Sequence, residues 1–111
     1  MLDKRKFYIN GQWIKPSKPN DFKVINPCNE EPCAIISLGS KEDTDVAIKS
    51  AKYAFRTWKE TTKEDRLNYL EKLLSVYKKR SVEMAEAISL EMGAPMDWAT
   101  DAQTASGQSH L

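Results

Sequence analysis

The stretch Phe7-Tyr8-Ile9-Asn10-Gly11-Gln12-Trp13-Ile14 decides how the fold begins, because it predicts a β-hairpin. Asn10-Gly11 separates two short runs rich in aromatic and β-branched residues. A two-residue hairpin turn needs a positive φ at both turn positions, which asparagine and glycine tolerate better than other residues. The chain therefore opens with two antiparallel strands at about residues 7–14.

A second hairpin is predicted at about residues 22–38. Its first strand, Phe22-Lys23-Val24-Ile25, ends at Asn26-Pro27, because the residue before a proline is forced out of the helical region. Its second strand runs from Ala34 to Leu38 and is ended by Gly39. The two strands pair across a turn that extends from Pro27 to Pro32.

Helices are predicted for the remainder of the chain, at about residues 41–59, 63–80, 82–92 and 95–111. Ser40 with Asp43, and Thr62 with Asp65, have the spacing of capping boxes that begin helices. Residues near Ser81 either begin a third helix or continue the second, which leaves three or four helices. Gly93 ends the third helix, and Pro95 lies in the first turn of the last one.

Apolar side chains recur at spacings of three and four along these helices, which predicts buried faces. They are Ala47, Ala51, Ala54, Phe55 and Trp58 in the first helix, Leu67, Leu70, Leu74 and Tyr77 in the second, and Val82, Ala85, Ile88 and Met92 in the third. In the last helix, Trp98, Ala102, Ala105 and Ser109 mark a face of mostly small residues. No stop signal follows Leu111, which predicts a helix that continues in a longer chain.

Composition excludes several classes of partner. Seventeen basic and sixteen acidic residues give a net charge of +1, so no strong field attracts nucleic acid or an anionic membrane. No apolar run is long enough to span a bilayer, and the charged first residues do not lead into a signal-peptide core. The predicted compartment is the cytosol, and neither nucleic acid nor membrane is expected as a partner.

No catalytic or cofactor-binding residue is predicted from motifs. Cys28 and Cys33 have acidic neighbours, which disfavour a reactive thiolate. A disulfide between them would need the hairpin to bring them together, and the reducing cytosol argues against it. His110 lies far from both cysteines and has no second metal-ligand pair beside it. The four glycines form neither a Gly-x-Gly-x-x-Gly motif nor a phosphate loop.

The order of these elements resembles the N-terminus of the aldehyde dehydrogenase superfamily. The resemblance covers about residues 7–111 and rests on several segments in the family's order and spacing: the first hairpin, Val24-Ile25-Asn26-Pro27, the helix from Asp45-Val46 to Trp58, Arg66 with the helix after it, and Leu90-Glu91-Met92-Gly93-Ala94-Pro95. Two features depart from the family pattern. Cys28-Asn29 replaces the usual small residues, and the alanine- and serine-rich last helix lacks bulky residues found in some branches.

The resemblance implies an α/β enzyme with a Rossmann-like coenzyme domain, of which residues 1–111 form a partial N-terminal part with no second domain. Such an enzyme oxidises an aldehyde to a carboxylic acid with NAD or NADP and usually forms a dimer or tetramer. Its cysteine nucleophile, glutamate base and oxyanion-binding asparagine would lie beyond Leu111. Cys28, Cys33 and Asn26 match none of them, so these 111 residues alone are expected to be inactive.

Two local roles follow from the resemblance. Gln103 and its neighbours would shape access of the aldehyde to the substrate tunnel. Some relatives bind a monovalent cation through backbone carbonyls near Val24-Ile25 and an acidic side chain at the position of Glu91. For Glu91, an ordinary place in a last helical turn is favoured, so the metal site is left undetermined. The alternative function is a self-contained small α+β binding or assembly module without catalysis.

Overall fold

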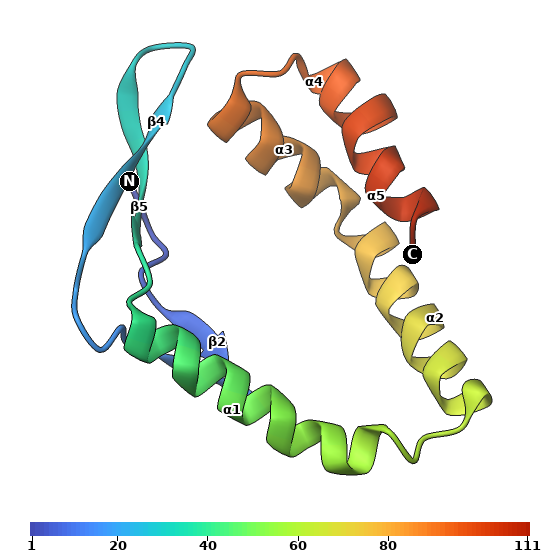
Figure 1. Ribbon diagram of the computed structural model, residues 1–111. Coiled ribbons are helices and arrows are strands. Elements are labelled where there is room, and N and C mark those ends of the chain that lie inside the picture. The colour runs from blue at the N-terminus through green and yellow to red at the C-terminus, as the bar shows by residue number, and fades with distance from the viewer. The chain divides into compact units, whose positions relative to one another are not determined.

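The structure is a computed structural model that describes residues 1–111, and its elements are shown in Figure 1. The chain forms two compact units. The first contains residues 1–25 and 32–60, and the second contains residues 26–31 and 61–111.

The first unit contains one long helix and five strands, apart from the strand residues Asn26 and Glu31, which are assigned to the second unit. The strands are β1 (Leu2–Asp3), β2 (Phe7–Ile9), β3 (Gln12–Ile14), β4 (Asp21–Asn26) and β5 (Glu31–Ser37), and the helix is α1 (Lys41–Trp58). β2 and β3 form a two-stranded sheet, whereas β1, β5 and β4 form a three-stranded sheet in that order. α1 packs against β2.

The first hairpin is confirmed. β2 and β3 pair antiparallel with Tyr8 opposite Trp13, and the rings of this pair lie 5.2 Å apart at an interplanar angle of 55°. Asn10 and Gly11 take φ values of 53° and 75°, the left-handed values that a two-residue hairpin turn requires.

The second hairpin is confirmed as well, but its second strand begins earlier than predicted. Glu30 adopts a positive φ of 59° and closes the turn, so that Pro32 lies inside β5 rather than in the turn. A proline is tolerated in a strand beside a free edge. β1 covers only Ala34 and Ile35 of β5, which leaves such an edge near Pro32.

β1 was not predicted from the sequence. Leu2 pairs with Ala34 and Asp3 with Ile35 in a parallel arrangement, and the amide of Lys4 donates to the carbonyl of Ile35 at 2.8 Å. Two residues are too few to carry an alternating pattern, and their partner strand lies far along the chain. Only the three-dimensional fold reveals this pairing.

Both predicted capping boxes are present. At the start of α1, the Ser40 hydroxyl accepts from the Asp43 amide at 3.2 Å, and the Asp43 carboxylate accepts from the Ser40 amide at 2.9 Å. Thr62 and Asp65 make the same reciprocal pair at the start of α2 (Lys63–Lys79). The first and second helices therefore begin where predicted.

The second unit contains the other helices. α3 (Ser81–Met92) is separated from α2 by Arg80, whose φ and ψ of −106° and 13° interrupt the helix. Gly93 ends α3 in the left-handed conformation with φ 74°. The last helix follows Pro95 and consists of α4 (Met96–Trp98), the π-helical turn η1 (Ala99–Thr104) and α5 (Ala105–Ser109). It ends at Ser109 rather than running to Leu111.

The π-helical turn changes which side of the last helix faces inward. The buried residues are Ala99 and Thr104, five positions apart, a separation that suits a π turn with its i to i+5 bonds. The face of mostly small residues marked by Trp98, Ala102, Ala105 and Ser109 is not the buried one, since Trp98 is 61% exposed. η1 packs against α3, and α5 contacts α2 (Figure 1).

The buried core is small. Ala85, Ala94 and Ala99 are its buried apolar residues, with Ile88 packed against them, and no large side chain is fully buried. The apolar faces predicted for α1 and α2 are mostly exposed, as at Phe55 and Leu70. A helix buries its stripe only where another layer covers it, and these 111 residues do not cover those two faces. No helix of the chain combines the length and apolar character needed to cross a bilayer.

Candidate functional site

The π-helical turn η1 is the feature of the backbone that most resembles a functional site. π turns are rare and often occur where a protein binds or acts. Two side-chain oxygen atoms are buried at this turn without a hydrogen-bond partner, Oε1 of Gln103 and Oγ1 of Thr104. Thr104 is only 3% exposed. A buried polar atom without a partner is uncommon and calls for an explanation.

A second helix holds this turn. The hydroxyl of Tyr77, on α2, donates to the carbonyl oxygen of Thr104 at 3.0 Å. The Gln103 amide, through Nε2, donates to the Met92 thioether sulfur at 3.4 Å. A carbon atom added at Gly107 would lie 3.1 Å from Cζ of Tyr77 and closer still to its hydroxyl. Gly107, which interrupts the small-residue pattern in the sequence, thus gives Tyr77 the space to reach Thr104.

The groups at this turn suit positioning rather than covalent chemistry. They are an amide, two hydroxyl groups and a thioether, which donate or accept hydrogen bonds without carrying charge at neutral pH. Gln103 was singled out from the resemblance. The sequence pattern indicates only that Tyr77 belongs to an apolar stripe and does not single out Thr104, because a π turn and a hydrogen bond between distant residues leave no local pattern.

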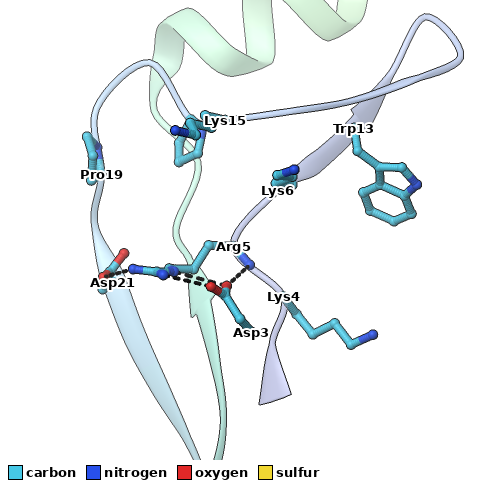
Figure 2. Close-up of a pocket in the computed structure, with 9 residues that line it drawn as sticks. Asp3, Lys4, Arg5, Lys6, Trp13, Lys15, Pro19 and Asp21 are labelled. Atoms are coloured by element: carbon cyan, nitrogen blue, oxygen red, sulfur yellow. Dashed lines mark hydrogen bonds and ion pairs between the residues drawn. The ribbon is translucent and has the colours of Figure 1, made fainter. Parts of the chain in front are cut away.

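A hollow of about 700 Å³ lies at the start of the chain (Figure 2). It is lined by Asp3, Lys4, Arg5, Lys6, Trp13, Lys15, Pro16, Pro19 and Asp21. Arg5 joins two carboxylates, at 2.7 Å to Asp3 and at 3.1 Å to Asp21, as the dashed lines of Figure 2 show. Hydrogen bonds from Arg5 lower the pKa of Asp3 from 3.8 to about 2, and the two carboxylates raise the pKa of Arg5.

This hollow has a weakly positive lining. Arg5 is neutralised by its two carboxylates, while Lys4, Lys6 and Lys15 form no ion pair. Trp13 is 66% exposed. Exposed lysines in water interact weakly with anions because solvent and salt screen them. The hollow has no cysteine, serine or histidine among its lining residues, and no motif in the sequence predicts it.

The cysteines do not form a disulfide. Both thiols are free, with Cys28 exposed and Cys33 half-buried. The Cys33 thiol donates to the carbonyl of Val24 at 3.4 Å. The side chain of Asn26 accepts from the Cys28 amide at 2.9 Å, which helps to form the turn between β4 and β5. Cys33 and Asn26 thus have structural partners.

The candidate cation ligands lie in different units. Val24 and Ile25 belong to β4 in the first unit, and Glu91 is exposed in the last turn of α3 in the second. No group of three or more histidine, cysteine, aspartate or glutamate side chains could hold a metal ion. His110 Nδ1 lies 2.7 Å from the Ser106 carbonyl at the end of α5.

The N-terminus of α1 is one place in this chain where a phosphate cradle could form. α1 is the one helix that follows a strand, β5, after a short connection containing Gly39. Asp43 occupies its N-terminus and holds the amides of Ser40 and Ser17. A carboxylate at that place would repel a pyrophosphate.

Comparison with known proteins gives a consistent match. The model of the aldehyde dehydrogenase family matches residues 13–109. A 3-succinoylsemialdehyde-pyridine dehydrogenase of a Pseudomonas species is 43% identical over 86% of this chain. An aldehyde dehydrogenase of Bartonella henselae superposes on 99% of this chain with a TM-score of 0.98 and 60% identity. Aldehyde dehydrogenase C of Pseudomonas syringae, solved with NAD+ and octanal, superposes on 96% of it with a TM-score of 0.94 and 38% identity.

The matched relatives are much longer than this chain. The 111 residues span 20% of the Pseudomonas dehydrogenase, 23% of the Bartonella henselae structure and 22% of the Pseudomonas syringae structure.

Proposed function

Because the chain belongs to the aldehyde dehydrogenase family, we propose that its protein oxidises an aldehyde to a carboxylic acid. Water supplies the added oxygen, and NAD+ or NADP+ accepts the hydride. The observation that carries the proposal is the agreement of the whole chain with a known aldehyde dehydrogenase, at a TM-score of 0.98 and 60% identity. NAD+ bound to the Pseudomonas syringae relative supports the choice of acceptor.

The proposed place of residues 1–111 is the N-terminal part of an α/β, Rossmann-like coenzyme domain. The exposed apolar faces of α1 and α2 support this role. Phe55 is 58% exposed and Leu67 is 52% exposed, and the apolar face of a helix is usually covered by another layer of protein. The same exposure weighs against the alternative of a self-contained binding or assembly module, because such a module would bury these faces.

The chemistry itself is assigned to residues outside these 111. The bound coenzyme supplies the hydride acceptor, and Asp43 closes the N-terminus of α1 to its phosphates. Neither Cys28 nor Cys33 has a histidine beside it in the sequence that would activate it as a nucleophile. The 111 residues alone are therefore proposed to be inactive.

Within this function, Gln103 is proposed to border the path of the aldehyde. Its half-buried amide lies on the π-helical turn, with Oε1 lacking a partner within the chain. A polar group in that state is suited to bind a small polar molecule or water. Gln103→Ala in the full-length enzyme should change the ratio of kcat/KM values for short and long aldehydes, and an unchanged ratio would contradict this role.

The proposed assembly is a homodimer or homotetramer, and the proposed compartment is the cytosol. Two free thiols fit a reducing compartment. The exposed apolar side chains also fit a protein that buries further surface on assembly. The size of the full-length protein in solution, measured by light scattering, tests the assembly.

The function is tested with the full-length protein encoded by the gene. Formation of reduced nicotinamide coenzyme is followed by absorbance for a series of aldehydes, with NAD+ and NADP+ in separate assays. The 111-residue chain, assayed in the same way, is the control and should show no turnover. Lack of oxidation by the full-length protein with every aldehyde and both coenzymes would overturn the proposal.

A further inference from the structure

We propose that Tyr77 is a positioning residue that holds the π-helical turn η1, and with it the side chain of Gln103, through its hydrogen bond to Thr104. The inference rests on the function proposed above, in which Gln103 borders the path of the aldehyde. It adds a residue on another helix that controls the geometry of that border.

The first observation is the hydrogen bond itself. Tyr77 lies in α2, twenty-seven positions before Thr104, and its hydroxyl reaches the Thr104 carbonyl at 3.0 Å. A carbonyl oxygen has two lone pairs, so this contact can exist beside any bond within the helix. Thr104 is the last residue of η1. The phenol therefore fixes the position at which the π turn returns to the α-helix.

The second observation is the space made for the phenol. A Cβ at Gly107 would lie 3.1 Å from Cζ of Tyr77 and nearer to its hydroxyl. Gly107 has no positive φ, so backbone conformation does not require a glycine there. What the glycine supplies is room for the Tyr77 ring against α5.

The third observation links the turn to Gln103. In a regular α-helix, Ala99 and Thr104 would not share a face, but here both are buried. The π turn thus rotates the residues after it relative to α4. Gln103 precedes Thr104 directly, so a shift of Thr104 moves Gln103 and its contact with the Met92 sulfur. Tyr77 acts on the site through Thr104 and does not itself touch the substrate.

The test uses Tyr77→Phe, Gln103→Ala and the double variant in the full-length enzyme. Loss of one hydrogen bond should raise the KM of the aldehyde about three- to tenfold, with the KM of NAD+ and kcat nearly unchanged. If Tyr77 acts through Gln103, the double variant should be no worse than Gln103→Ala alone. Fully additive losses, or an unchanged aldehyde KM in Tyr77→Phe, would overturn the proposal.

Tyr69→Phe is the matched control, because it removes the same hydroxyl group from an exposed tyrosine of α2, which is 56% exposed. Gly107→Ala is a second variant that should break the same hydrogen bond, because the added methyl group displaces the Tyr77 ring. It should raise the aldehyde KM as Tyr77→Phe does. A Gly107→Ala enzyme with an unchanged aldehyde KM would count against the proposal.

A second readout separates this inference from the proposed function. Amide hydrogen exchange across residues 99–107 should become faster in Tyr77→Phe than in Tyr69→Phe, whether or not the enzyme oxidises aldehydes. Faster exchange without any aldehyde oxidation would refute the proposed function and the role of Tyr77 at a substrate path. It would still establish that the hydrogen bond from Tyr77 to Thr104 stabilises the π turn. Unchanged exchange in Tyr77→Phe would refute this stabilisation of the π turn, even if the enzyme is active.

Discussion

The backbone amide of Ser17 donates to Oδ1 of Asp43 at 2.8 Å and joins the loop before β4 to the first turn of α1. The other carboxylate oxygen, Oδ2, accepts from the amide of Ser40 at 2.9 Å and from its hydroxyl at 2.8 Å. One aspartate thus closes a helix and fixes a loop. These hydrogen bonds, with the Ser40 amide first, lower the pKa of Asp43 from 3.8 to about 2.

The lowered pKa of Asp43 predicts acid sensitivity at the start of α1. A carboxyl group with a lower pKa in the folded state stabilises the fold above its unfolded pKa, and this contribution is lost as the pH falls through the folded value. In the full-length protein, amides of the first turn of α1 should lose protection between pH 3.8 and about pH 2. Hydrogen exchange should show no such step in Asp43→Asn.

Asp45→Asn is the control for Asp43, because Asp45 is exposed and pairs only with Lys41. It should retain the pH-dependent loss of protection at the start of α1. If Asp45→Asn abolished that loss as fully as Asp43→Asn, the assignment to Asp43 would be wrong.

Gly93 and Gly11 predict two different costs of adding a methyl group. Both have positive φ, 74° and 75°, so alanine at either position should cost about 1–2 kcal/mol of conformational strain. A Cβ at Gly93 would also lie 2.7 Å from Cγ of Pro27, whereas a Cβ at Gly11 would point into open space. Thermal unfolding of the full-length protein should therefore show a larger fall in Tm for Gly93→Ala than for Gly11→Ala. Equal falls in Tm would show that the Pro27 side chain moves away from the added methyl group without a measurable cost.

The two thiols should react at different rates. Cys28 is exposed, while Cys33 is half-buried and hydrogen-bonded to Val24. A thiol reagent should label Cys28 faster in the native chain, and denaturant should remove the difference. Mass spectrometry of digested peptides measures the labelling of both cysteines at once. The variants Cys28→Ser and Cys33→Ser identify which peptide carries which label. Faster labelling of Cys33 would contradict the structure.

The exposed apolar faces predict poor behaviour of the 111-residue chain in isolation. Phe55, Leu67 and Leu70 are each close to half exposed or more, so the chain should bind the dye ANS and aggregate. Fluorescence and light scattering test this directly. A sharp two-state melt without ANS binding would instead support the self-contained module.

Local features of the fold could be predicted from the sequence because their causes are local. Asn10-Gly11 dictates a turn through its own conformational preferences, and Ser40 with Asp43 begins a helix through hydrogen bonds three residues apart. Gly93 ends α3 for the same kind of reason. Each signal lies within a few residues of the structure that it causes.

Features that depend on distant residues could not be predicted. β1 exists because Leu2 and Asp3 meet Ala34 and Ile35, and Arg5 bridges Asp3 to the distant Asp21. The π turn also has no signature in its own residues, so a helical period of 3.6 does not identify Ala99 and Thr104 as the buried residues of the last helix. Of the candidate site, only Gln103 was anticipated, by family resemblance rather than by pattern. Its partners Tyr77 and Thr104 required the structure.

The strand order β1-β5-β4 makes β5 the shared member of two pairings. Its two neighbours differ in kind, since β4 joins it through a tight turn and β1 joins it from a distant part of the chain. If β1 dissociates, the pairing of β4 with β5 remains. If β5 is displaced, both pairings of the sheet are lost. The integrity of this sheet therefore depends on β5, whereas β1 is a peripheral strand.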